Sequence, residues 1–175
     1  MGDSANYPVT LALGLLIARV VIGVLMAAHG AQKLFGWFGG YGLTTTGEFF
    51  VQLGFRPGRA YATIASVGEV ASGLLVAAGF LGPVGPAIMI SVMIVAAISV
   101  HWQNGLFAQS NGIEVPLLYA TGALGFALAG FGPYSLDRLL GITTTWTPML
   151  TLTVLAVGIA GGVMNLLIRR RPATR

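Results

Sequence analysis

The chain has no cysteine, so it cannot form a disulfide, bind a metal through a thiolate or carry out cysteine redox chemistry. Charge is scarce too, because nine basic and five acidic residues make up only 8% of the 175 residues. Soluble domains are roughly a quarter charged. Hydrophobic residues make up 55% of the chain, so most of its folded surface must face lipid. The composition excludes an ordinary soluble domain and predicts an integral membrane protein.

Motifs for nucleic-acid binding, nucleotide binding and common hydrolytic chemistry are also missing. Four of the nine basic residues lie in the last seven positions, and none forms a basic patch interleaved with aromatic residues, so no nucleic-acid partner is predicted. No strand precedes the glycine patterns, and no nucleophile elbow, Walker motif or metalloprotease pair occurs. These absences leave open whether the chain is an enzyme, and they favour an accessory subunit over a standalone enzyme.

What the chain does contain is a series of apolar segments. A membrane span needs about 20 mostly apolar residues, and five segments approach or reach that length, separated by glycine- and proline-rich turns. They cover residues 9–28 (continuing to about 35), 60–80, 87–100, 115–131 and 147–168. Between the first two, Thr46 could open a short interfacial helix with Glu48 in its first turn. The sequence therefore predicts an all-α membrane protein with antiparallel spans.

Five spans place the loops alternately on two membrane faces. Face A would hold the N-terminus, the turn at residues 82–85 and the loop at residues 132–146, whereas face B would hold residues 36–59, residues 101–114 and the C-terminus. Face A has only Arg138 as a basic residue. Face B has seven: Lys33, Arg56, Arg59, Arg169, Arg170, Arg171 and Arg175. By the positive-inside rule, face B is predicted to be cytoplasmic and the N-terminus to lie outside.

Two ionisable residues lie deep in the predicted spans. Arg19 is near the middle of the first span and Glu69 near the middle of the second. Because consecutive spans are antiparallel neighbours, the two residues should reach similar depths, and an Arg19–Glu69 ion pair is predicted. Such a pair could serve function or simply order the bundle. Removing one partner of a buried pair typically costs about 3–5 kcal/mol.

Polar residues also gather towards face B. In the first span, Arg19, His29 and Lys33 belong to a stripe at three- and four-residue steps, which should face the bundle interior. His101 ends the third span and Glu114 opens the fourth on the same face. We therefore predict a candidate ligand site there. Its members would be His29, Lys33, Glu69, His101 and Glu114.

Three interpretations of this cluster remain open. The spacing matches no dedicated metal motif, so no metal site is predicted, although two histidines with two acids could bind one. The histidines could instead hydrogen-bond a quinone or move its protons, because histidine titrates near neutral pH. The third interpretation is structural: Lys33 extends its amine to the interface, the histidines cap helix ends, and Trp37 and Trp102 belong to the interfacial aromatic belt.

Several of these residues lie in a pattern that resembles the DoxX family. The specific element is His29-Gly30-Ala31-Gln32-Lys33-Leu34-Phe35-Gly36. Around it stand residues 16–23, 68–73 and 132–140, together with His101. The resemblance covers about residues 10–141 and implies a four-helix transmembrane bundle. By motif it carries over Arg19, His29, Lys33, Glu69 and His101.

The resemblance also implies a function. Related proteins are named as subunits of quinol oxidase and thiosulfate:quinone oxidoreductase, and some are linked to superoxide dismutase and a sulfurtransferase in oxidative-stress defence. The expected fold is thus an antiparallel four-helix bundle, residues 1–141, followed by an extra helix with a basic tail, residues 142–175. The expected function is an accessory subunit of a respiratory or oxidative-stress redox assembly.

Its partners would be the lipid bilayer and redox-enzyme or respiratory-complex subunits. The cofactor is not identified by any motif; a quinone near His29 and His101 is the candidate. Two other functions remain as alternatives. The chain could be a non-catalytic scaffold that recruits soluble redox enzymes, or a small-molecule transporter, which would require a continuous polar path.

Overall fold

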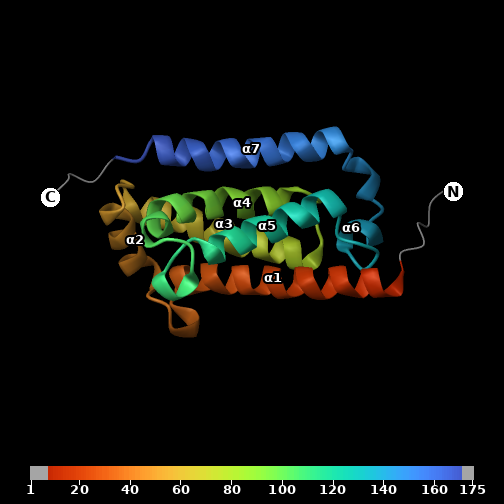
Figure 1. Ribbon diagram of the computed structural model, residues 1–175, viewed down its shortest axis with the longest axis horizontal. Coiled ribbons are helices and arrows are strands. Elements are labelled where there is room, and N and C mark those ends of the chain that lie inside the picture. Colours follow the sequence, from red (N-terminus) through yellow and green to blue (C-terminus); the bar gives the residue numbers. More distant parts are fainter. Residues whose placement is uncertain (1–7, 171–175) are drawn as a thin grey trace.

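The computed structural model describes residues 8–170, all of whose regular structure is helical (Figure 1). Five helices lie along the long axis: α1 (Val9–Phe35), α3 (Gly58–Ala78), α4 (Val84–Ala96), α5 (Glu114–Ala129) and α7 (Pro148–Leu167). Two short α-helices connect them, α2 (Gly42–Gln52) and α6 (Leu136–Leu139). Short 3-10 turns are η1 (Trp37–Gly39), η3 (Trp102–Asn104), η4 (Ala108–Ser110) and η5 (Thr143–Thr145), and η2 (Ala97–His101) is a π-helix.

Four helices in the described residues are long and apolar enough to cross a membrane. They are α1, α3, α7 and the continuous helix Val84–Asn104, in which α4 runs on through η2 and η3. The prediction of an all-α membrane protein is therefore confirmed. The fourth predicted span, α5, has 16 residues and rises about 24 Å, less than the hydrocarbon thickness of roughly 30 Å. The short helix expected near Thr46 is α2.

The helices place their connections at two ends, as the predicted alternation requires (Figure 1). The "α6 end" holds the start of α1, the α3–α4 turn, α6 and the start of α7. The "α2 end" holds α2, the segment between α4 and α5, and the end of α7. These two ends correspond to the predicted faces A and B.

Glycines set the register between α1 and α3, which pack closely. A Cβ added at Gly23 would overlap the backbone of Gly73, and one added at Gly30 would overlap the backbone of Ser66. Small residues of this kind allow helix backbones to approach in lipid, where no hydrophobic driving force brings helices together. The pairs Gly23–Gly73 and Gly30–Ser66 fix an antiparallel alignment, which decides the partners of every polar side chain on the two helices.

The last helix, α7, packs mainly on α4. The two helices run parallel because α5, which lies between them in the sequence, brings the chain back to the α6 end. Gly158 lies against the backbone of Ala87, and Gly162 against that of Ser91. The backbone N–H of Arg170 donates to the carbonyl of Gly54 at 3.0 Å, which holds the end of α7 at the α2–α3 loop. The fifth helix is thus an integral wall of the bundle.

Candidate functional site

One cavity of the described residues, of about 510 Å³, is predominantly apolar and contains ionisable groups. Its walls come from α3, α4 and α7, and α2 closes it at one end. Most lining side chains are small or aliphatic. The polar ones are Lys33, Thr46, Tyr61, Glu69, Ser91, Ser99, His101 and Asn165. We call this hollow the "α3–α7 cavity"; an apolar cavity with a few polar groups is typical of a small-molecule site.

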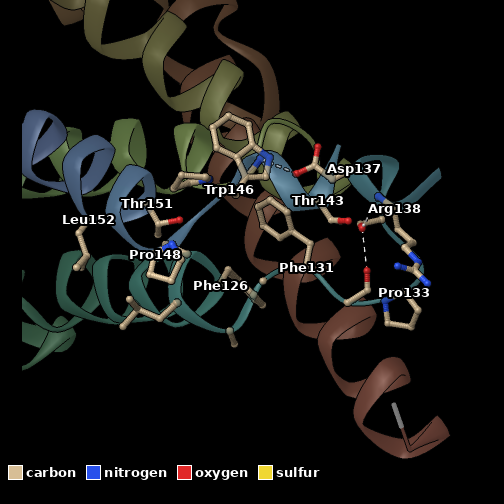
Figure 2. A pocket seen from close by; sticks show the side chains of 18 residues that line it. Phe126, Phe131, Pro133, Asp137, Arg138, Thr143, Trp146, Pro148, Thr151 and Leu152 are labelled. Atoms are coloured by element: carbon tan, nitrogen blue, oxygen red, sulfur yellow. Dashed lines mark hydrogen bonds between the residues drawn. The ribbon is translucent and has the colours of Figure 1, made fainter. Parts of the chain in front are cut away.

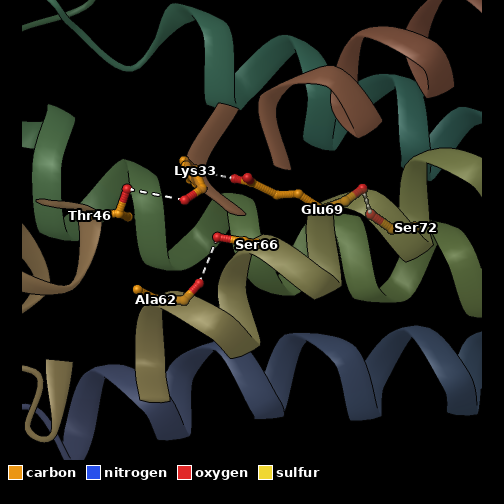
Figure 3. A network of polar contacts seen from close by, with 6 residues as sticks. All are labelled: Lys33, Thr46, Ala62, Ser66, Glu69 and Ser72. Atoms are coloured by element: carbon orange, nitrogen blue, oxygen red, sulfur yellow. Dashed lines mark hydrogen bonds and ion pairs between the residues drawn. The ribbon is translucent and has the colours of Figure 1, made fainter. Parts of the chain in front are cut away.

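An ion pair lies at the polar part of this cavity. The Lys33 ammonium donates to Glu69 Oε1 at 2.5 Å (Figure 3). The Glu69 side chain is 1% exposed and that of Lys33 35% exposed. Glu69 Oε2 is buried and has no hydrogen-bond partner in the structure. Buried polar atoms are nearly always hydrogen-bonded, so this free oxygen is an acceptor to which a ligand can donate.

The predicted Arg19–Glu69 ion pair is wrong, since Glu69 pairs with Lys33. The reason is the direction of side chains on antiparallel helices. Side chains lean towards the N-terminus of their own helix, so Lys33 leans towards the α6 end and Glu69 leans towards the α2 end, and the two meet. Arg19 lies about 21 Å from Lys33 along α1, towards the α6 end. Its side chain leans away from Glu69.

Arg19 instead holds the α6 end together. Its guanidinium donates to the carbonyls of Ala77, in the last turn of α3, and of Tyr134, at 2.5 Å for the latter. A cation suits the C-terminal end of a helix, where carbonyls lack partners. The role of Arg19 in this structure is therefore the clamping of α1 to α3 and to the loop before α6.

A second cavity, of about 520 Å³, lies beside this clamp (Figure 2). Its buried acid, Asp137, accepts hydrogen bonds from the backbone N–H groups of Leu81 and Gly82 at 2.8 and 2.7 Å. Ser135 caps α6 by accepting from the N–H of Arg138. The Asp137 side chain thus joins α6 to the α3–α4 turn, and the Ser135 side chain holds the start of α6.

His101, one of the predicted site residues, lines the α3–α7 cavity. Its Nδ1 lies 2.8 Å from the carbonyl oxygen of Asn111. A carbonyl can only accept, so Nδ1 carries the proton and Nε2 is left as the free ring nitrogen. His101 ends the π-helix η2, which also carries Ser99, whose buried Oγ has no partner. π-turns inside α-helices are frequent at functional sites.

His29 and Glu114 reach the same end of the bundle but do not line the cavity. His29 is exposed on α1 and packs edge-on against Tyr119 of α5, with ring centroids 5.8 Å apart. Glu114 Oε2 accepts from the backbone N–H of Ala108 at 2.7 Å and so orders the loop before α5. Among residues 8–170 no three His, Asp or Glu side chains lie close enough to bind a metal.

The structure adds cavity residues that sequence reasoning did not select. Ser99 and Asn165 interrupt otherwise apolar spans, and this was the only signal that pointed to them. Thr46 and Tyr61 belong to segments that the sequence placed near the interface, without a partner. Their inclusion depends on how α2 and α7 pack, which no local pattern specifies.

Comparison with known proteins agrees with this fold. The DoxX family model matches residues 14–102, just over half of the chain, from α1 to the end of the long third span. The match includes Lys33, Glu69 and His101, and it ends before α5 and α7. No curated protein and no solved structure matches the chain. The predicted domain boundary at residue 141 stays a prediction, and the chain belongs to the DoxX family.

Proposed function

We propose that this multi-pass membrane protein binds the head group of a quinone in the α3–α7 cavity and serves as an accessory subunit of a membrane redox assembly. The observation that carries the proposal is the Lys33–Glu69 pair, which lines a predominantly apolar cavity and leaves the buried Glu69 Oε2 free. A buried charge in a membrane helix is costly to maintain without a role.

The polar residues fit a quinone in both of its stable redox forms. A bound quinone would supply reversible two-electron, two-proton chemistry. The Lys33 ammonium has N–H groups beyond the one given to Glu69 and can donate to a ring carbonyl. Glu69 Oε2 can accept from a ring hydroxyl, and so can neutral His101 through Nε2. These residues would bind and orient the ring and hold its protons, whereas a partner subunit would exchange the electrons.

The proposed site departs from the sequence prediction in two members, His29 and Glu114, which do not line the cavity. The quinone was expected near His29 and His101; because His29 lies outside the cavity, we propose that it binds at the remaining predicted residues, Lys33, Glu69 and His101. Glu69 lies near the middle of α3, and Lys33 and His101 lie towards the α2 end of the cavity. By the distribution of basic residues, we propose that this end is cytoplasmic, where soluble redox enzymes would reach it.

The histidines provide a matched test. Wild type, His101→Ala and His29→Ala are reconstituted into nanodiscs and titrated with the tail-less quinones menadione and ubiquinone-0 by calorimetry. We expect one of these quinones to bind wild type and His29→Ala alike, and His101→Ala and Glu69→Gln to weaken binding by about tenfold, as loss of a hydrogen bond to a ligand does. Failure of wild type to bind either quinone, or equal weakening by the two alanine variants, would contradict the proposal.

A further inference from the structure

Arg138, the only basic residue of the predicted face A, has no role in the proposed function. Loops on the non-cytoplasmic side of a membrane carry few basic residues, and in the proposed orientation Arg138 is an exception. Its side chain is exposed and, among residues 8–170, pairs with no carboxylate. The neighbouring Asp137 accepts from the backbone N–H groups of Leu81 and Gly82 instead. Arg138 is therefore a cation without a counter-ion at the α6 end.

Arg138 lines the second cavity, of about 520 Å³, which lies between the last turn of α5 and the first turn of α7 (Figure 2). We call it the "α5–α7 cavity"; small-molecule sites have volumes of about 300–1,000 Å³. The end of α5 brings the negative end of a helix dipole and the start of α7 the positive end, so the two dipoles offset each other. Both oxygens of Asp137 are taken up by the α3–α4 turn. The charge that the cavity offers to a ligand is therefore that of Arg138.

The α5–α7 cavity also has a side that faces the bilayer. Leu128 of α5 and Leu152 of α7 both line it and are 61% and 59% exposed. The two helices pack on α4 and barely contact each other, so helix packing does not close the space between them. Figure 2 shows Leu152 and Arg138 at opposite sides of the cavity, with Trp146 between them. The cavity thus presents aliphatic side chains at one side and a cation at the other.

Trp146 lies at the boundary between these two sides. Its ring lies against the α3–α4 turn, where a Cβ added at Gly82 would collide with it. Its Nε1 is buried and has no hydrogen-bond partner among the described residues. Tryptophan is enriched at membrane–water interfaces, where its ring lies at the level of the lipid head groups. Because Trp146 and Arg138 both belong to the segment that joins α5 to α7 and both line the cavity, Arg138 lies near that level too.

We propose that the α5–α7 cavity holds one glycerophospholipid of the adjoining leaflet, with its phosphodiester on Arg138 and an acyl chain between α5 and α7. The planar guanidinium offers paired N–H donors that match two phosphate oxygens. An acyl chain gains no hydrophobic driving force by moving from lipid to the space beside Leu128 and Leu152. The contact with Arg138 therefore supplies the selectivity. This site is separate from the α3–α7 cavity and does not depend on quinone binding.

The test uses Trp146 as its probe. Trp37→Phe and Trp102→Phe together leave Trp146 as the only one of the three tryptophans. In this background, lipid-free protein in detergent micelles is titrated with phosphatidylglycerol whose acyl chains are brominated, because bromine quenches tryptophan fluorescence at close range. We expect Arg138→Gln to weaken the binding that causes quenching by about tenfold, as loss of a hydrogen bond to a charged group does. Arg56→Gln, which removes an exposed arginine from the α2 end, should leave it unchanged.

Competitors without bromine separate a phospholipid from other ligands. Phosphatidylglycerol should restore the fluorescence, and diacylglycerol, which lacks the phosphodiester, should need about ten times its concentration. Glycerol 3-phosphate, which lacks the chains, should not compete. Equal competition by diacylglycerol, full competition by glycerol 3-phosphate, or equal losses in Arg138→Gln and Arg56→Gln would overturn the proposal. Should Arg138→Gln fail to fold, the comparison of phosphatidylglycerol with diacylglycerol in the protein that retains Arg138 decides the question.

Discussion

At the scale of residues, the position of a charged side chain along its helix and the direction in which it leans decide which group it contacts. Lys33 and Arg19 are both cations of α1, and both lean towards the α6 end. Lys33 meets the carboxylate of Glu69, whereas Arg19 meets the bare carbonyls at the end of α3. One cation thus belongs to the candidate site and the other to the scaffold, although the two occur on one sequence stripe.

The buried pair yields a stability prediction. Lys33→Met would leave the buried carboxyl group of Glu69 without its counter-ion, and we expect the free energy of unfolding to fall by about 3–5 kcal/mol. The double variant Lys33→Met, Glu69→Gln removes both charges and should recover part of that loss. SDS-induced unfolding in mixed micelles measures both. Arg56→Met, which removes an exposed cation from the same end, is the control; an equal effect there would contradict the prediction.

Asp137 yields a second prediction at this scale. Its carboxylate accepts from two backbone N–H groups of the α3–α4 turn. Asp137→Asn replaces one acceptor oxygen by an NH₂ group that faces a donor, so we expect a loss of about 1–3 kcal/mol. The neighbouring Arg138→Gln, an exposed position, should change stability by less than about 0.5 kcal/mol. Thermal unfolding of the two variants in the same detergent compares them, and similar midpoints would argue against the clamp.

At the scale of elements, glycines separate helix packing from cavity formation. On α7, Gly158 and Gly162 lie against the backbone of α4, whereas Gly161 faces open space. On α1 and α3, glycines set the register that brings Lys33 to Glu69. The same residue type therefore joins two helices at one position and leaves room for a ligand one turn away.

This difference can be measured by adding one methyl group. Gly158→Ala places a Cβ against the backbone of Ala87 and should push α7 from α4, lowering the unfolding free energy by about 1–3 kcal/mol. Gly161→Ala places its Cβ at ordinary contact distance and should be neutral within about 0.5 kcal/mol. SDS titration of both variants tests the contrast; a destabilised Gly161→Ala with a neutral Gly158→Ala would reverse the assignment of the two faces.

At the scale of the whole molecule, the alternating directions of α1, α3, α4, α5 and α7 send the start of α1 and the end of α7 to opposite ends of the bundle (Figure 1). Lys33 and His101 of the candidate site lie towards the α2 end and Glu69 near the middle of α3, whereas Arg19 and Asp137 hold the α6 end. The molecule is thus polarised, with a ligand site towards one membrane face and a structural clamp at the other.

Orientation is testable because the chain has no cysteine of its own. Thr144→Cys and Ser110→Cys place single thiols at exposed loop positions of the α6 and α2 ends. A membrane-impermeant maleimide should label Thr144→Cys in intact cells and Ser110→Cys only after permeabilisation, because the basic residues cluster at the α2 end. The opposite labelling pattern would place the ligand site on the outer face.

The sequence by itself determined the membrane class, the helix positions to within a few residues, and the end of the bundle at which His29, Lys33, His101 and Glu114 lie. Composition, span length and alternation are properties of the chain taken in order, so no packing information was needed for them. The tertiary structure decided that Glu69 pairs with Lys33 rather than Arg19, that His29 lies outside the cavity, and that α7 completes it. Those outcomes depend on helix register, on rotation about each axis and on the direction in which side chains lean, and these are set only when the helices pack together.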